Sequence, residues 1–289
     1  MLIVAVSAFA VWLPRRNMLA VMMTGGKVSD DHLRYRIDST IRAWIPLSIW
    51  LRVLPWLEEN SGLLSTDDQI QNVELPNKDV SLTAVTRLRN FHRLGGVSVY
   101  PRHLGPILDP LASIEKLHFV WIDSLQSDSD LGELKRLPQL EHLWLSKPPA
   151  TGGGWKSLCD LPRLTHLGLD AAASCAALTE MGSIPSLERL TLQNCAIHDD
   201  DLRSLSDCIR LRFISTPGSS AVGATGLKHL ACCTSLETLS MSCLSSDDEL
   251  QVLTELRNLK RLDIRGPNLT PDGIDRLKLA LPKCVIDAR

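Results

Sequence analysis

The chain has 289 residues, a formal net charge of −2, 44% hydrophobic residues and 22% charged residues, which excludes disordered and collagen-like classes. The near-zero charge and the lack of lysine or arginine blocks beyond short pairs argue against a nucleic-acid partner. The 8 cysteines include no Cys-x-x-Cys pair, which favours core use in a reducing compartment over a disulfide framework.

The first segment, residues 1–14, is a hydrophobic anchor or signal-like segment. An apolar run over 2–13 ends at Pro14, Arg15 and Arg16. A helix of this length reaches only ~18 Å against a hydrocarbon core of ~30 Å. Basic residues follow the run and none precedes it, which predicts a membrane anchor with the rest of the chain in the cytoplasm, export being the alternative.

Residues 15–65 are predicted to be a juxtamembrane and N-terminal capping region. Within it, residues 44–57 hold three tryptophans spaced by six and are interrupted by Pro46, Arg52 and Pro55, so they do not form a regular spanning helix. They either lie in the membrane interface or pack over the open end of the repeats, and we favour the second. His32 and scattered carboxylates here do not amount to an active site.

Residues 66–289 contain a repeat. Apolar residues follow one another at spacings of three and finally of two, which predicts a helix, a turn and a short strand in each unit. The clearest unit is Leu131, Leu134, Leu137, Leu140, Leu143 and Leu145. Other units begin at Val85, Leu108, Trp155, Leu178, Leu202, Leu227 and Leu250, and a degenerate first strand is expected at Ile70, Val73 and Leu75.

One unit departs from the regular period. We interpret it as Leu108, Leu111, Ile114, Leu117 and Phe119, which places Ile114 in the first strand position, 20 residues after Leu94 and 26 before Leu140. The other separations are 23 to 25 residues. At the C-terminus, residues 281–286 place Cys284 in the same position, as a half-repeat that closes the array.

This pattern resembles the leucine-rich-repeat family, whose L-x-x-L-x-L signature and 20–29-residue period it matches. The resemblance implies an α/β solenoid of about nine repeats, with a curved parallel sheet on the concave side and helices on the convex side. The N-terminus is similar to bacterial members with a hydrophobic anchor, a basic pair and an element like Gly25-Gly26-Lys27-Val28. Cys195 followed by Cys208 resembles the cysteine-containing subclass of these repeats.

Several motifs have a structural interpretation within the repeat. The aspartates at 199–201 and 247–248 are expected in first helical turns, and Thr270 with Pro271 as a cap, rather than at a metal site. His229, Cys232 and Cys233 have a zinc-like spacing, but Cys208 and Cys233 occupy core positions. Residues 152–157 lack a phosphate-binding pattern and are interpreted as a flexible loop. With no catalytic motif, we expect no enzyme, no cofactor and no metal.

The outward residues of the strands are the candidate site, because leucines occupy the inward positions. Two outward columns carry cationic, histidine and aromatic side chains, and a third column at the strand starts is mostly acidic; this patterned charge suits a protein ligand. Both His142 and His166 are expected to gain charge as the pH falls from 7.5 to 5.5. The predicted binding residues are Lys116, His118, His142, Trp144, His166, Arg189, Thr191, Phe213, Arg261 and Asp263.

The sequence therefore predicts a non-enzymatic protein–protein interaction module, tethered to a membrane, that presents the concave face of its repeats. The alternative is a substrate-receptor subunit of a ubiquitin-ligase-like complex. An enzyme with a site in residues 15–65 is a weaker third class. The sequence identifies neither the protein ligand nor an oligomeric state.

Overall fold

The computed structural model describes residues 27–29, 34–35, 72–75, 82–90 and 94–288, the last range with gaps at 102, 126, 149–151, 173–177, 179–183, 220–221, 243 and 245. The chain divides into two compact units, residues 1–102 with 106–120, and residues 103–105 with 121–289. The predictions for residues 2–13 and 44–57 lie outside the described residues. Within the described ranges, no helix has the length and apolar character needed to cross a membrane.

The first unit combines a small antiparallel edge with the start of the repeats. Strand β1 pairs antiparallel with β2 and β3, and β3 pairs in parallel with β4, which sets Val73 opposite Val97. The predicted first strand is thus confirmed. The elements are β1 (Lys27–Ser29), β2 (Arg34–Tyr35), β3 (Asn72–Leu75), α5 (Leu82–Leu88), β4 (Gly96–Val99), α6 (Gly105–Ala112) and the beginning of β5 (Phe119–Asp123).

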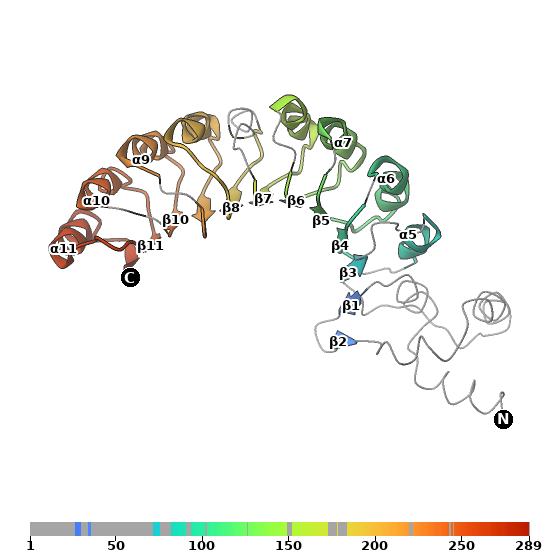
Figure 1. Ribbon diagram of the computed structural model, residues 1–289, viewed down its shortest axis with the longest axis horizontal. Helices are drawn as coiled ribbons and strands as arrows, with labels where there is room; N and C mark the ends of the chain where they lie inside the picture. The colour runs from blue at the N-terminus through green and yellow to red at the C-terminus, as the bar shows by residue number, and fades with distance from the viewer. Residues whose placement is uncertain are drawn as a thin grey trace. The chain divides into compact units, whose positions relative to one another are not determined.

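The second unit alternates strands with helices. Each strand from β6 to β12 pairs in parallel with the next. Within this unit the strands line the concave side and the helices the convex side (Figure 1). After the end of β5 come α7 (Asp128–Glu133), η1 (Leu134–Arg136), β6 (His142–Ser146), η2 (Gly152–Asp160), β7 (His166–Asp170), β8 (Arg189–Gln193), η3 (Asp199–Asp207), β9 (Phe213–Thr216), α9 (Ala224–Ala231), β10 (Thr238–Met241), α10 (Asp247–Leu253), β11 (Arg261–Ile264), α11 (Pro271–Ala280) and β12 (Val285–Ala288).

The core follows the predicted spacing. All six positions of the unit from Leu131 to Leu145 are at most 2% exposed. Residues exactly three apart lie on one face of a 3₁₀ helix, which has three residues per turn. The structure forms this spacing with 3₁₀ helices in η1, η2 and η3 and with short α-helices in α9 and α10. The α/β leucine-rich-repeat architecture predicted from the spacing is confirmed.

The strand β5 corrects the register of the unit that begins at Leu108. Its inward residues are Val120 and Ile122, both fully buried, rather than Leu117 and Phe119. The backbone N–H groups of His118 and Phe119 donate to Gly95 O. In β7, the N–H groups of Thr165 and His166 donate to Glu141 O in the same way.

The corrected register restores the period. Leu117 takes the position of Leu140, so the steps from Leu94 to Leu117 and from Leu117 to Leu140 are each 23 residues. Lys116 therefore lies in the turn before β5, and His118 directly precedes the strand. Their predicted placement as outward strand residues is wrong.

The glycine-rich segment is also different from expectation. Residues 152–160 form the helix η2, so the prediction of a flexible loop is wrong. A Cβ on Gly154 would lie 2.4 Å from Asp128 O; glycine therefore allows η2 to approach the backbone of the preceding repeat closely. Trp155 is 2% exposed in the core position that leucine occupies in other units.

The predicted caps and core cysteines are confirmed. Thr270 caps α11 and accepts a hydrogen bond from Gly273 N, with Pro271 at the first helical position. Cys208 and Cys233 are 3% and 4% exposed, and the Cys233 thiol donates to Leu205 O at 3.3 Å. Burial raises the pKa of Cys208 to about 11 and that of Cys233 to about 12. At the C-terminus, β12 adds the predicted half-repeat beside β11.

Candidate functional site

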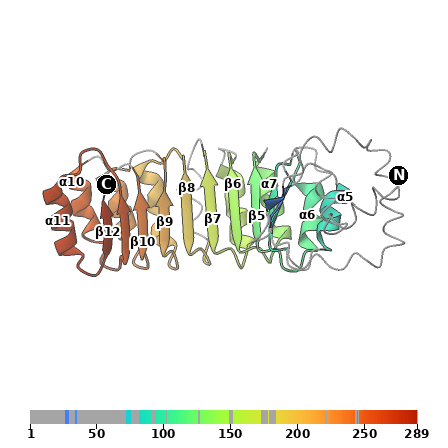
Figure 2. The ribbon, with the colours of Figure 1, turned by 90° about the horizontal axis from the view of Figure 1, so that it is seen from below.

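The outward side chains of the strands form the candidate site, which we call the strand face. The sheet register places its residues in two columns that cross β6 to β11, as the sequence predicted. Figure 2 shows these strands side by side. The first column is His142, His166, Arg189, Phe213, Thr238 and Arg261. The second is Trp144, Gly168, Thr191, Ser215, Ser240 and Asp263.

Two tryptophans lie beside each other at one end of these columns. The rings of Trp121 and Trp144 have centroids 6.2 Å apart, and Trp121 Nε1 donates to Ser146 Oγ at 3.0 Å. Trp121 is 37% exposed. The sequence interpretation missed Trp121 because of the register error in β5. The uneven separations of 20 and 26 residues were the signal that would have found it.

The Trp144 ring covers the glycine of the next strand. A Cβ on Gly168 would lie 2.0 Å from Trp144 Cε3, so the ring occupies the space that any other residue at this position would fill. The hydrogen bond to Ser146 holds Trp121, and the contact with Gly168 holds Trp144. Their aromatic surface is therefore ordered before any ligand arrives.

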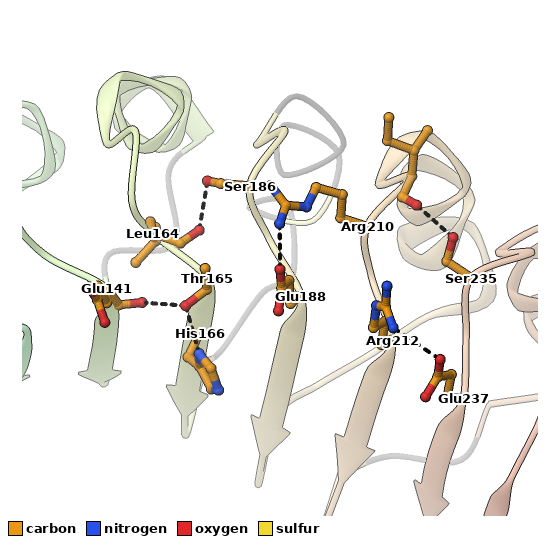
Figure 3. Close-up of polar contacts among 11 residues, drawn as sticks. Glu141, Leu164, Thr165, His166, Ser186, Glu188, Arg210, Arg212, Ser235 and Glu237 are labelled. Atoms are coloured by element: carbon orange, nitrogen blue, oxygen red, sulfur yellow. Dashed lines mark hydrogen bonds and ion pairs between the residues drawn. The ribbon is translucent and has the colours of Figure 1, made fainter.

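His142 and His166 stack on adjacent strands, with ring centroids 4.0 Å apart. His166 Nδ1 lies 2.8 Å from Thr165 Oγ1, whose hydroxyl donates to Glu141 O (Figure 3). Burial first, and then the charges of His142 and Arg189, lower the pKa of His166 to about 4. The expectation that His166 gains charge between pH 7.5 and 5.5 is therefore wrong.

Arg189 and Phe213 make the third feature of the strand face. The guanidinium of Arg189 lies 4.0 Å from the centroid of the Phe213 ring, a cation–π arrangement. Among the described residues no carboxylate forms an ion pair with Arg189. Its side chain is exposed.

Unlike Arg189, the charged side chains at and just before the strand starts form ion pairs with one another. Arg212 contacts Glu237 at 3.1 Å and Arg210 contacts Glu188 at 2.7 Å (Figure 3). Lys260 also contacts Glu237, at 2.8 Å. The hydrogen bond from Lys260 lowers the pKa of Glu237. These exposed pairs add little stability, but they neutralise the charges around Arg189. The Arg189 guanidinium itself has no carboxylate partner among the described residues.

The zinc-like spacing at residues 229–233 does not bring its side chains together. Cys232 is exposed while Cys233 is buried against the preceding repeat. No group of three or more histidine, cysteine, aspartate or glutamate side chains suited to a metal ion occurs in the part of the chain that the structure describes.

Comparison with known proteins identifies the fold. No family model and no curated protein matches the sequence. The solved structure of TLR13 in complex with ssRNA13 is similar, with a TM-score of 0.55 and 15% identity, over 76% of this chain and 32% of that chain. An internalin (inlF) from Listeria monocytogenes matches with a TM-score of 0.44 and 14% identity, over 71% of this chain and 65% of that chain.

The third similar structure is a leucine-rich-repeat protein from Leptospira interrogans, with a TM-score of 0.42 and 17% identity, over 70% of this chain and 50% of that chain. The chain thus spans about a third of TLR13 and less than two thirds of the internalin. Together with the sheet register, the likeness to TLR13 shows that this chain has the leucine-rich-repeat fold.

Proposed function

We propose that the protein is a non-enzymatic protein-binding module that uses its strand face, centred on β6 to β9. The observation that carries the proposal is the continuous set of aromatic and cationic side chains on this face, from Trp121 and Trp144 to Arg189 and Phe213. Exposed tryptophan and arginine are the residue types that most often anchor protein interfaces.

The scaffold supports this role because the site residues come from strands. The site residues from Trp121 to Phe213 lie beside inward leucine, isoleucine or valine residues that are at most 2% exposed, so their backbones are held rigidly. Rigid presentation reduces the entropy that binding removes. The binding role of the predicted residues from His142 to Asp263 is part of this proposal.

The experiment is affinity capture with the tagged full chain and two variants. Trp144→Ala removes the centre of the aromatic surface, whereas Lys228→Ala changes an exposed residue of α9 on the convex side. A partner of the strand face binds about 2 kcal/mol more weakly to the Trp144 variant and equally well to the control.

Two results would reject the proposal. One is a partner lost equally with Lys228→Ala, and the other is a partner retained by Trp144→Ala. Single-stranded RNA is included as a ligand because the TLR13 structure is a complex with ssRNA13. Salt-sensitive RNA binding as the sole activity of the strand face would replace the protein ligand by a nucleic acid.

We also propose a membrane tether through residues 2–13, with the repeats on the cytoplasmic side. The apolar run and the basic residues that follow it support this proposal. Deletion of residues 1–16 should move the protein from the membrane fraction to the soluble fraction. Recovery of a shortened chain outside the cell would favour export. The substrate-receptor alternative stays a prediction, tested by co-purification with a ubiquitin-ligase adaptor.

A further inference from the structure

Arg189 presents hydrogen-bond donors that no described residue uses. The guanidinium lies over the Phe213 ring, 4.0 Å from its centroid, and this contact restrains a planar group whose N–H donors form a fixed fork. Two parallel N–H groups match the two oxygens of one carboxylate, a charge-assisted pair stronger than a neutral hydrogen bond. Phe213 therefore orders a carboxylate-binding group on the strand face.

His166, opposite Arg189 in the sheet register, presents an acceptor. Because the Thr165 hydroxyl donates its hydrogen to Glu141 O, its oxygen is left to accept from His166 Nδ1–H at 2.8 Å. We assign the lone pair to Nε2 on this basis. A neutral imidazole beside the cation of Arg189 thus offers an acceptor for a peptide N–H without adding a second charge.

The distance from the aromatic surface to Arg189 sets a spacing. Trp144 and Arg189 lie two strands apart, and their columns are two residues apart along the strands. With ~4.8 Å between strands and ~3.3 Å per residue, their Cα atoms are ~12 Å apart. An extended peptide covers that distance in three or four residues at ~3.3 Å each.

We infer that the strand face binds an extended acidic protein segment in which a large apolar residue lies three or four positions from an aspartate or glutamate. The apolar side chain packs on Trp121 and Trp144, and the carboxylate pairs with Arg189. This inference rests on the proposed function and specifies the chemistry of its ligand.

A phosphate backbone fits the same surface less well. Binding to RNA phosphates requires several available cations, and Arg210, Arg212 and Lys260 are already paired with glutamates. A single ordered guanidinium between an aromatic ring and a neutral imidazole suits one carboxylate.

The experiment selects displayed random peptides on the full-length protein and sequences them. Selected peptides should contain a large apolar residue and an acidic residue three or four positions apart. One such peptide and its Glu→Gln counterpart are then titrated against wild type, Arg189→Gln, Arg203→Gln and Trp144→Ala. Arg203 is the matched control because it is an exposed arginine of the helix η3, outside the strand face.

The expected result is a loss of about tenfold in affinity from Arg189→Gln, with no further loss when the peptide carries glutamine. Arg203→Gln should leave affinity within about twofold, because Arg203 is an exposed residue of η3 and its charge is screened from a carboxylate held at Arg189. The coupling between Arg189 and the peptide glutamate is the readout that distinguishes pairing from general charge.

Other results overturn the inference in different ways. Peptides that bind through Trp144 but show no acidic preference, or that couple equally to Arg203, reject the carboxylate site and leave the proposed function standing. Peptides insensitive to Trp144→Ala reject both. Failure to select any peptide rejects the acidic segment as ligand. Tighter binding of a single-stranded RNA oligomer that Arg189→Gln abolishes replaces the acidic segment by a nucleic acid.

Discussion

The strands β6 to β9 and the strands β10 and β11 share one frame but present different surfaces. Their inward residues are similarly buried, at most 5% exposed from Leu143 to Ile264. Outward, the first group carries Trp144, stacked histidines and the Arg189–Phe213 pair, whereas the second carries Thr238, Ser240, Arg261 and Asp263. Inward positions therefore define the scaffold, and outward positions distinguish one part of the strand face from another.

The largest effect expected is from a change on the inward side of β8. Leu190 is fully buried, so Leu190→Ala should lower the free energy of unfolding by about 2–5 kcal/mol. Arg189→Gln, one residue away and outward, should lower it by less than about 1 kcal/mol. Urea unfolding of both variants measures the difference. Similar losses would mean that the outward column also stabilises the fold.

The contact between Trp144 and Gly168 allows a test of the aromatic surface. In Gly168→Ala the new methyl group displaces the Trp144 ring, which should cost about 1–3 kcal/mol of stability and weaken ligand binding. Tryptophan fluorescence should shift to longer wavelength as the ring becomes solvated. Ser215→Ala, in the same column, is the control and should change stability by less than about 0.5 kcal/mol; equal effects would argue against a fixed ring position.

The neighbouring cysteines 232 and 233 test the inward side in another way. Cys233→Ala and Cys208→Ala should each cost about 1 kcal/mol, as small truncations in the core. Alkylation with iodoacetamide at neutral pH should modify exposed Cys232 readily, and Cys233 only on unfolding, because burial raises its pKa to about 12. Rapid modification of Cys233 in the folded protein would contradict its core assignment.

The turns after the strands offer a smaller, stabilising change. Ser124, Lys147, Ala171 and Asn194 have positive φ angles of 58°, 47°, 52° and 51°, which non-glycine residues rarely adopt. Ala171→Gly should raise the free energy of unfolding by about 0.5–1 kcal/mol, since it relieves ~1–2 kcal/mol of strain and increases the entropy of the unfolded chain by less. Ala231→Gly at the end of α9 should be destabilising instead.

Most of the repeat was predictable because a spacing of three and then two is the direct consequence of a helical turn followed by a strand. The unit at β5 was misread since Leu117-x-Phe119 imitates the alternation of a strand, while the true inward pair is Val120 and Ile122. The hydrogen bonds from His118 and Phe119 to Gly95 O and the burial of Val120 and Ile122 distinguish the two registers. The start of the 3₁₀ helix at residues 152–160 was taken for a loop because glycines usually indicate one, whereas Gly154 here allows the close approach to Asp128.

The columns of the strand face were predictable from β6 onward, but their chemistry was not. The Trp144 ring over Gly168 and the guanidinium over Phe213 are contacts between side chains on adjacent strands. Their geometry depends on rotamers that a spacing pattern does not contain. The same holds for the titration of His166, where sequence alone suggested an ordinary imidazole.

The last prediction concerns that titration. Burial, His142 and Arg189 lower the pKa of His166 from 6.5 to about 4, against weaker opposite contributions from Glu188 and Glu141. His166 should therefore stay neutral between pH 7.5 and 5.5, and its ring signals should not shift in an NMR titration over that range. Removal of the second cause in His142→Gln should raise the pKa of His166 only partly, because burial remains.

The sign of the linked stability effect follows from the unfolded state. There His166 has its ordinary pKa of 6.5, so between pH 6.5 and 4 the unfolded chain binds more protons than the folded one. The contribution of neutral His166 to folding is complete above pH 6.5 and declines as the pH falls towards 4. An NMR titration midpoint near pH 6.5 for His166 in the wild type would contradict the desolvation of the His142–His166 stack. A neutral His166 means that this part of the strand face does not gain a charge at that residue between pH 7.5 and 5.5.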